Sequence, residues 1–468
     1  MSTKLLRHIS LIGVGVYLLA LVVISIAFPN HALQPKWMFW GIGEVLFFFM
    51  LLTLFYPRWK NDGQKTFLRK VFWVALSIRV AYVIFSYFYF ISVNGYPFEH
   101  PGDAIGYFNR SWYLSKLVRE GRFDAVFDFL KSSAMGFSDQ GYVMWLTLIH
   151  LIFGRNVLVT RFLKALMSAY MCVVIYKLGS RTCGERTGRL AAVMCVFMPT
   201  LIQITGLHIK ETEMIFLSIL ALERMDYLIR SKRYTFWNIL FPILLTGLTF
   251  GFRTVIGMCL IFSFLVFVVC SPRTLVNTRG KVIALSTTLA VLLLFLLTAI
   301  GTEMQIMYRL NFSGSDYLSR KYESMGLEYN ELAQSKYLFP GAFVLPLSPL
   351  VEEAPNHNKM LNGSIYVKNF LAFFAMLAIV IAVRQRKWRD FSLVGAFELS
   401  YVGIVMSSFT ATSERYHEPA IPLMLLMAAY AMTHLRHKDL RLFYVYCGLL
   451  FVALFAWNWL KLAARGMI

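Results

Sequence analysis

The stretch "ISLIGVGVYLLALVVISIAF", residues 9–28, runs for twenty positions without a charged side chain. An α-helix rises about 1.5 Å per residue, so such a run covers the roughly 30 Å hydrocarbon layer of a bilayer. It follows Lys4 and Arg7, as the apolar part of a signal peptide would, but no small-residue cleavage site comes after it. We therefore expect a first transmembrane helix here.

Similar apolar runs recur along the whole chain. Of its 468 residues, 58% are hydrophobic and only 15% are charged, whereas about a quarter are charged in soluble domains. The sequence predicts an all-α polytopic membrane protein, with residues 1–468 forming one integral membrane domain. About thirteen spans are expected, near 9–28, 37–56, 71–93, 156–178, 190–207, 211–229, 237–252, 254–270, 282–300, 366–383, 391–409, 418–434 and 443–460.

The net charge of +21 is concentrated in short loops between these spans. Every second loop is rich in Lys and Arg, as in "RWKNDGQKTFLRK", "KLGSRTCGERTGR" and "RQRKWR". Such loops face the cytoplasm, so the basic balance indicates topology and attraction to anionic membrane lipids, not nucleic-acid binding. This places residues 94–155, residues 301–365 and the C-terminus on the extracytoplasmic side.

The first outer segment contains "HPGDAIGYFNRSWYLSKL", residues 100–117. Apolar residues after Asp103 recur at near-helical spacing, which is typical of a helix lying in the membrane interface. Two further interface pieces follow, "DAVFDFLKSS" and "GYVMWLTLIHLIFG". Asp103 can act as a helix cap, because Asp accepts from exposed N–H groups there. A carboxylate at this place can also accept a proton, and the two roles are compatible.

Five motifs in order resemble one family. They are "GDAIGY", "GYVMWLTLIHLIFG", "RFLKALMSAYMCVVIYKLGSR", "MPTLIQITGLHIKE" and "SERYHEPAIPLMLLMAAY". This order resembles the GT-C superfamily of membrane glycosyltransferases, which includes protein O-mannosyltransferases and the aminoarabinose transferases of lipid A. Two features depart from the family pattern. Asp103 is followed by Ala104, where many relatives have an acidic pair, and Asp139-Gln140 stands where a Pro is common.

The resemblance implies transfer of a sugar from a polyprenyl-phosphate carrier, of the undecaprenyl or dolichyl kind, at the extracytoplasmic face. The acceptor would be a glycan, a lipid or a protein, and a bacterial inner membrane is the expected location. In such enzymes an essential Asp lies in the first outer loop, which here is Asp103. As a general base it would take the acceptor's proton. An inverting single displacement needs only one such base, unlike the two carboxylates of most glycoside hydrolases.

Further candidates lie at the predicted outer ends of spans. Lys210, Arg253 and Arg415, with Tyr416 beside them, are the candidates for binding the donor phosphate, because cations there can hold its charge. Each could instead be a snorkelling or topological residue. Glu211 is a second catalytic candidate, able to orient an acceptor or to pair with a cation. The remaining site candidates are His208, His417, Asp139 and Tyr142.

No cofactor is required by these motifs, but a divalent cation is possible. His208 and Glu211 are three residues apart and would share a face if they stood on one helix. In the second outer segment, the Pro-rich half of residues 301–365 predicts a lid or a partly inserted loop. A mobile connector is the alternative.

Two other functions remain open from the sequence. An enzyme of the O-antigen polymerase or ligase type also uses polyprenyl-linked sugars, but it lacks the early acid followed by interface helices. A flippase or transporter would favour ionisable groups near mid-membrane. Glu44, Arg79 and Glu398 lie inside predicted spans, so this class stays an alternative.

Overall fold

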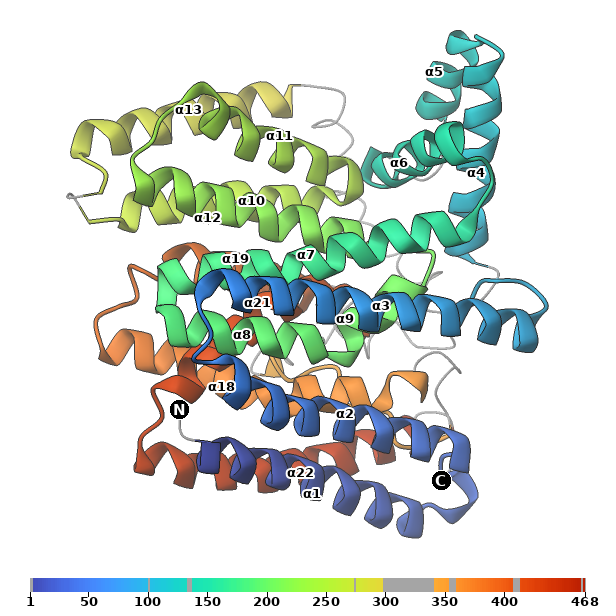
Figure 1. Ribbon diagram of the computed structural model, residues 1–468, viewed down its shortest axis with the longest axis vertical. Helices are drawn as coiled ribbons and strands as arrows, with labels where there is room; N and C mark the ends of the chain where they lie inside the picture. The colour runs from blue at the N-terminus through green and yellow to red at the C-terminus, as the bar shows by residue number, and fades with distance from the viewer. Residues whose placement is uncertain are drawn as a thin grey trace.

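The protein is helical throughout the part of the chain that its computed structural model describes (Figure 1). Apart from an isolated bridge between Ala32 and Val351, no β-structure occurs in that part. The described residues are 3–99, 102–132, 137–272, 275–297, 341–352, 359–406, 413–463 and 466–467.

Each expected span coincides with a helix or a pair of helices. These helices are α1 (Thr3–Ala27), α2 (Pro35–Trp59), α3 (Gln64–Asn94), α7 (Val157–Cys183), α8 (Glu185–Phe197) with α9 (Pro199–Gln203) and η2 (Ile204–Gly206), α10 (Glu211–Ser231), α11 (Phe236–Phe252), α12 (Thr254–Cys270), α13 (Thr278–Leu296), α18 (Asn362–Arg384), α19 (Ser392–Met406), α21 (Ile421–Thr433) and α22 (His437–Ala463). The other elements of the described part are η1 (Pro29–His31), α20 (Glu414–His417), η5 (Glu418–Ala420) and the group α4–α6 below.

Among the described helices, α1, α2, α3, α7, α18 and α22 are long and apolar enough to cross a membrane. A seventh is added if α8 and the α9–η2 segment are counted as one broken span. The integral membrane class is therefore supported, while the expected number of about thirteen spans is not established. The run expected as one span at 190–207 is in fact two helices that meet at a bend of 56°.

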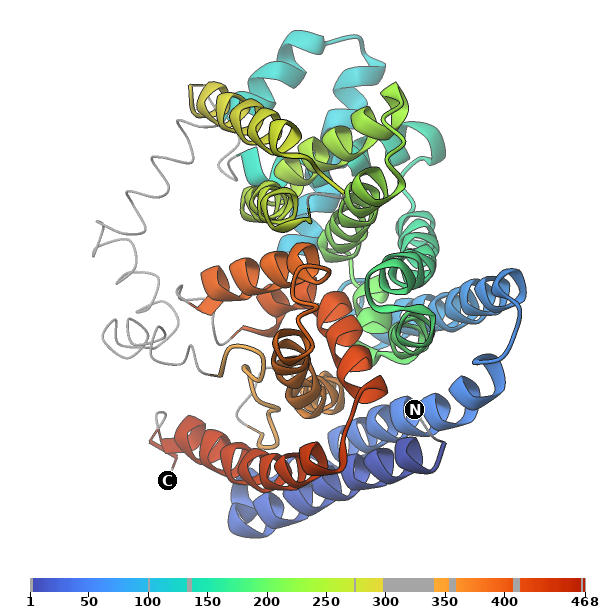
Figure 2. The same cartoon turned by 90° about the vertical axis from the view of Figure 1, so that its left-hand side faces the viewer.

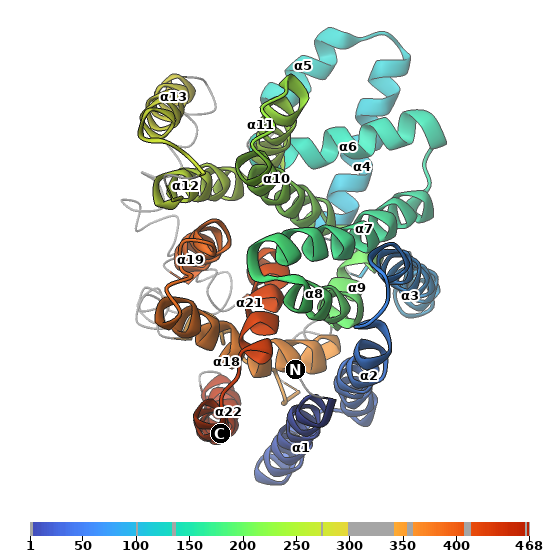
Figure 3. The same ribbon diagram turned by 60° about the vertical axis from the view of Figure 1, so that its left-hand side comes forward.

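The helices form stacked layers, which Figures 1, 2 and 3 show from three sides. At one end of the molecule lie α1, α2 and α22, and both chain termini lie in this region. The centre is made by α7, α8, α18 and α21, which pack on one another. The other end is formed by α10, α11, α12 and α13.

The segments expected as interface helices form α4 (Asp103–Arg119), α5 (Phe123–Ser132) and α6 (Phe137–Phe153). They stand together at one corner of the molecule, where α6 packs on α11 (Figure 1). This contact is close because two glycines meet in it. A Cβ atom on Gly141 would stand 2.6 Å from the carbonyl carbon of Gly251. Only glycine allows such an approach of two helix backbones, so Gly141 determines how closely α6 packs on α11.

One intramembrane acid serves the fold directly. Glu44 on α2 is 8% exposed, and its Oε2 accepts the backbone N–H of Ser364 at 2.9 Å. Ser364 belongs to the first turn of α18, where backbone N–H groups have no partner within the helix. The Trp40 indole N–H donates to the other oxygen of Glu44 at 3.0 Å. Through these hydrogen bonds Glu44 ties α2 to the start of α18.

Most of the segment expected as a lid, residues 301–340 and 353–358, lies outside the described residues. Of its described residues, those at 341–352 pack against the core through polar contacts. The Ser348 N–H donates to Asn369 at 3.1 Å, the Leu350 N–H donates to Asn458 at 2.8 Å, and Lys368 donates to the Leu345 carbonyl at 3.0 Å. Buried irregular backbone needs such partners, and here side chains of α18 and α22 supply them.

Candidate functional site

Asp103 is the first residue of α4 and stands directly after Gly102, which is the N-cap. The position proposed for it as a cap is therefore taken by its neighbour. The Asp103 carboxylate is bonded to another side chain, since its Oδ2 accepts a hydrogen bond from Nη1 of Arg415 at 2.6 Å. The side chain of Asp103 is 47% exposed, so the carboxylate is accessible from outside.

Arg415 joins Asp103 to a second acid. It lies in the short helix α20, and its Nε donates to Oε1 of Glu211. The side chain of Glu211 is fully buried, whereas that of Arg415 is 29% exposed. Burial disfavours the charge of Arg415, but the Glu211 and Asp103 carboxylates outweigh it and raise the pKa of the guanidinium. Three segments far apart in the sequence thus meet at one guanidinium.

Lys210 directly precedes Glu211 and is the N-cap residue of α10. Its ammonium donates to Asp139 on α6 and, at 2.9 Å, to the Phe252 carbonyl at the end of α11. Burial, with the nearby Arg253 and Arg415 cations, lowers the pKa of Lys210 to about 7. The ion pair with Asp139 acts in the opposite direction, because an adjacent negative charge favours the ammonium. Lys210 is therefore a cation whose charge depends on pH near neutrality.

Arg253 separates α11 from α12 and lies over an aromatic ring. Its guanidinium carbon is 4.6 Å from the ring centre of Tyr416, the residue that follows Arg415. Arg253 also hydrogen-bonds to Tyr401 of α19, and the Tyr401 hydroxyl donates to the Tyr416 carbonyl at 2.8 Å. This arrangement fixes the orientation of the partly buried Arg253 guanidinium over Tyr416, the residue next to Arg415.

The aromatic rings of Tyr142 and His208 lie close to each other. The Tyr142 ring packs edge-on against Tyr107 of α4, with ring centres 5.0 Å apart, and its centre lies 6.3 Å from that of His208. Neither ring nitrogen of His208 has a hydrogen-bond partner in the described part of the chain. Burial and the nearby Lys164 and Arg161 cations lower its pKa well below the usual value. His208 is thus a neutral imidazole at physiological pH.

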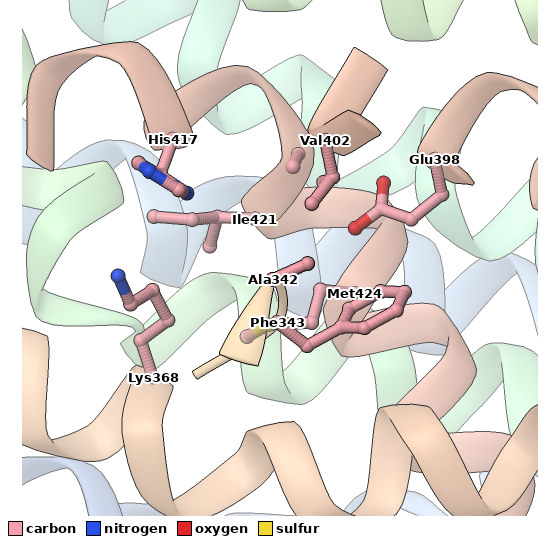
Figure 4. A pocket seen from close by; sticks show the side chains of 9 residues that line it. Ala342, Phe343, Lys368, Glu398, Val402, His417, Ile421 and Met424 are labelled. Carbon is pink, nitrogen blue, oxygen red and sulfur yellow. The ribbon is translucent and has the colours of Figure 1, made fainter. Parts of the chain in front are cut away.

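His417 lines a small cavity together with Lys368 of α18 and Glu398 of α19 (Figure 4). Lys368 and His417 lie on one side of this cavity, and the Glu398 carboxyl points toward it from the other. The cavity measures about 10 Å³, which is close to the smallest space that holds one water molecule. It is too small for a sugar or a lipid phosphate.

The possible divalent site between His208 and Glu211 does not have the expected geometry. Helix α10 begins at Glu211, whereas His208 lies in the turn before it, so the two do not share a helix face. Within the described ranges, no group of three or more His, Cys, Asp or Glu side chains is placed to hold a metal ion.

Two basic residues of α7 were not singled out from the sequence but support the site. Arg161 donates to the Pro97 carbonyl at 2.5 Å, in the segment leading to Asp103. Lys164 donates to the Leu207 carbonyl at 2.8 Å and pairs with Glu213 at 3.7 Å. Their spacing on an apolar helix, three residues apart, places them on one face. Two cations on one face of a predicted span were the signal that could have identified them.

Comparison with known protein families gives one match that bears on this geometry. Residues 141–299 match the dolichyl-phosphate-mannose-protein mannosyltransferase family. The match confirms the predicted resemblance to the GT-C superfamily and supports a membrane glycosyltransferase of that type. The matched stretch contains Lys210, Glu211 and Arg253, while Asp103 and Arg415 lie outside it. A search of curated proteins finds no match.

Proposed function

We propose that this membrane glycosyltransferase of the GT-C type transfers a sugar from a polyprenyl-phosphate donor to an acceptor, with Asp103 as the general base. The observation that carries the proposal is the single guanidinium of Arg415 that joins Asp103 to Glu211. It brings an accessible carboxylate beside three cations, Lys210, Arg253 and Arg415. A transfer from a lipid phosphate needs a base for the acceptor and positive charge for the leaving group.

The proposed reaction is a single displacement. The Asp103 carboxylate takes the proton of the acceptor hydroxyl or amine, and the acceptor atom forms a bond to the anomeric carbon of the sugar. The bond from that carbon to the phosphate oxygen breaks, and its electron pair leaves with the polyprenyl phosphate. The exposed half of Asp103 allows an acceptor to approach the carboxylate within hydrogen-bond distance, as general-base catalysis requires.

The three cations would stabilise the charge that develops on the leaving phosphate. The bonds of Arg415 to Asp103 and Glu211 use two of the five N–H donors of a guanidinium, so the same side chain can also donate to phosphate oxygens. Such charge-assisted bonds are short and strong, particularly where water is partly excluded. Glu211 would hold Arg415 in place and would not itself take a proton from the acceptor.

The alternative functions receive less support. Of the three intramembrane charges that favoured a transporter, Glu44 is bonded to the start of α18 and Arg79 to the end of α8, so neither is placed to bind a transported ion. The third, Glu398, lines a cavity of about 10 Å³, which has room for about one water molecule. No described contact favours an O-antigen polymerase or ligase over the proposed transfer. The extracytoplasmic side, which follows from the basic loops, and the bacterial inner membrane, which the family resemblance implies, remain part of the proposal.

The test is product analysis with the purified protein and a panel of polyprenyl-phosphate sugars, comparing the unaltered chain with Asp103→Asn. The amide cannot accept the proton, and loss of a general base typically lowers the rate about 10²–10⁴-fold. We expect the variant to keep its thermal stability and its binding of undecaprenyl phosphate. The matched control is Asp124→Asn, which changes an exposed Asp in the first turn of α5 and should transfer sugar normally.

The proposal fails in two ways. If no polyprenyl-phosphate sugar yields a product with the unaltered protein under conditions where it binds the carrier phosphate, the proposed transfer is wrong. If Asp103→Asn transfers sugar at the normal rate, the reaction does not use this base.

A further inference from the structure

The bend between α8 and α9 lies at Pro199 and leaves a carbonyl group without its helical partner. Proline has no N–H, so residue 199 cannot donate to the carbonyl of Cys195, four positions earlier. Met198 has the extended conformation, with φ −65° and ψ 113°, that a following proline favours. The chain therefore leaves α8 and turns by 56° into α9.

Arg79 of α3 supplies the missing donors. Its Nη2 donates to the Cys195 carbonyl at 3.0 Å, and its Nη1 donates to the Val196 carbonyl at 3.3 Å. The side chain of Arg79 is fully buried. Irregular backbone at membrane depth is tolerated only where its polar groups are paired inside the protein, and at this break the pairing comes from one arginine.

The charge of Arg79 is compensated without a carboxylate. Among the described residues, no Asp or Glu lies within ion-pair distance of it. Instead, Arg79 stands at the carboxyl end of α8, where the helix dipole favours a cation. Its Nε donates to the Ser168 hydroxyl of α7 at 2.7 Å, which leaves this nitrogen satisfied.

The same face of α7 holds the backbone beyond the break. The Ser168 hydroxyl donates to the Leu201 carbonyl at 3.3 Å, and Lys164 donates to the carbonyls of Leu207 and Ile209. Ile209 is followed directly by Lys210 and Glu211. The segment from Cys195 to Ile209 is therefore fixed along its length by α3 and α7, and it ends at the candidate site.

We propose that Arg79 is a positioning residue, which holds the break at Pro199 in its bent form and thereby sets the place of Lys210 and Glu211. The inference rests on the proposed function in one respect, namely that these two side chains serve the donor phosphate. Arg79 acts through the backbone and touches none of the proposed reacting groups.

Two substitutions test this role. Arg79→Met removes the donors from the Cys195 and Val196 carbonyls, so we expect a lower temperature of thermal unfolding. Pro199→Ala restores a backbone N–H that can bond to the Cys195 carbonyl and continue α8, so we expect it to remain folded. Because the continued helix would displace Lys210 and Glu211, Pro199→Ala should bind undecaprenyl phosphate about tenfold or more weakly, as expected for loss of a charge-assisted contact.

The double variant Arg79→Met/Pro199→Ala separates positioning from stability. The backbone N–H that the alanine restores at position 199 replaces the lost donor at Cys195, so at least about half of the stability lost in Arg79→Met should return. Binding of undecaprenyl phosphate should nevertheless stay weak, because the bend is gone. Arg79→Met alone, measured well below its unfolding temperature, should also bind undecaprenyl phosphate more weakly than the unaltered chain, because the bend is no longer held. A purely structural arginine would leave binding by the folded variant unchanged. Arg79→Lys keeps a cation with three donors at the end of α8. Compared with Arg79→Met, it should therefore retain more of the thermal stability and more of the binding of undecaprenyl phosphate.

A matched control lies away from the break. Tyr366 of α18 is fully buried, and its hydroxyl donates to the Gly13 carbonyl of α1 at 2.7 Å, outside the segment from Cys195 to Ile209. The effect of Tyr366→Phe on stability should therefore be the same in the unaltered chain and in the Pro199→Ala variant. The inference is overturned if Arg79→Met destabilises the protein equally in both backgrounds, or if folded Arg79→Met binds undecaprenyl phosphate normally. The stability measurement needs no substrate, so it stands even if the protein proves not to transfer sugar.

Discussion

Replacing Arg415 with Met should destabilise the protein through Glu211 rather than through Asp103. Met keeps much of the length of the side chain but carries no charge and no donor. The Glu211 carboxylate, fully buried and bonded to Arg415 through Oε1, then loses this partner. Removing one member of a buried ion pair typically costs about 3–5 kcal/mol, because the other charge stays buried and unpaired.

The contribution of Asp103 should be small by comparison. Its side chain is 47% exposed, so water replaces much of what Arg415 provided, and exposed pairs are worth only about 0–1 kcal/mol. We therefore expect Arg415→Met/Glu211→Gln to recover most of the lost stability, since a neutral amide needs no counter-charge. Arg415→Met/Asp103→Asn, the matched control, should recover little. Neither double variant should regain donor use, because the cation is missing.

Thermal unfolding in detergent can be followed by reaction of buried thiols with a thiol-reactive dye. Cys172 and Cys195 are fully buried and become accessible when the helices separate. The heating rate must be the same for all variants, because unfolding of such proteins is commonly irreversible. Unfolding of Arg415→Met at the normal temperature would refute the reasoning, as would equal recovery with Glu211→Gln and Asp103→Asn.

Two more predictions concern pH and topology. Because the pKa of Lys210 is lowered to about 7, donor use should fall as the pH rises through 7, and Lys210→Arg should abolish this fall. The unfolded lysine keeps its proton up to about pH 10.4, so between pH 7 and about pH 10.4 the folded state binds fewer protons and its stability should rise with pH. Values of kcat/KM and melting temperatures measured from pH 6 to 10 check the two effects, and flat profiles would contradict them. For topology, a membrane-impermeant maleimide should label Glu120→Cys but not Lys65→Cys in intact cells, both positions being exposed, and the reverse pattern would invert the assignment.

Local sequence patterns were sufficient to locate the helices. Hydropathy depends on residues that are neighbours in the chain, so the uncharged run at residues 9–28 became α1, and the near-helical spacing after Asp103 became α4. The residues later found together were also identified by type, as acids and cations at the predicted outer ends of spans. The bend at Pro199 was missed although its signal was local, because a proline inside an apolar run was read as part of one span.

Which charges meet was decided by tertiary structure alone. Arg415 bonds to Asp103 across 312 positions and to Glu211 across 204, and no local pattern records such a pairing. The separate pairing of Asp139 with Lys210 also needs the close contact of Gly141 with Gly251, which brings α6 against the end of α11 where Lys210 is bonded. Likewise, the sequence showed Arg79 only as an unexplained charge in a predicted span. Its carbonyl partners are known only from the packing of α3 against the end of α8. A side chain's charge follows from its chemistry, but its partner follows from how the helices pack.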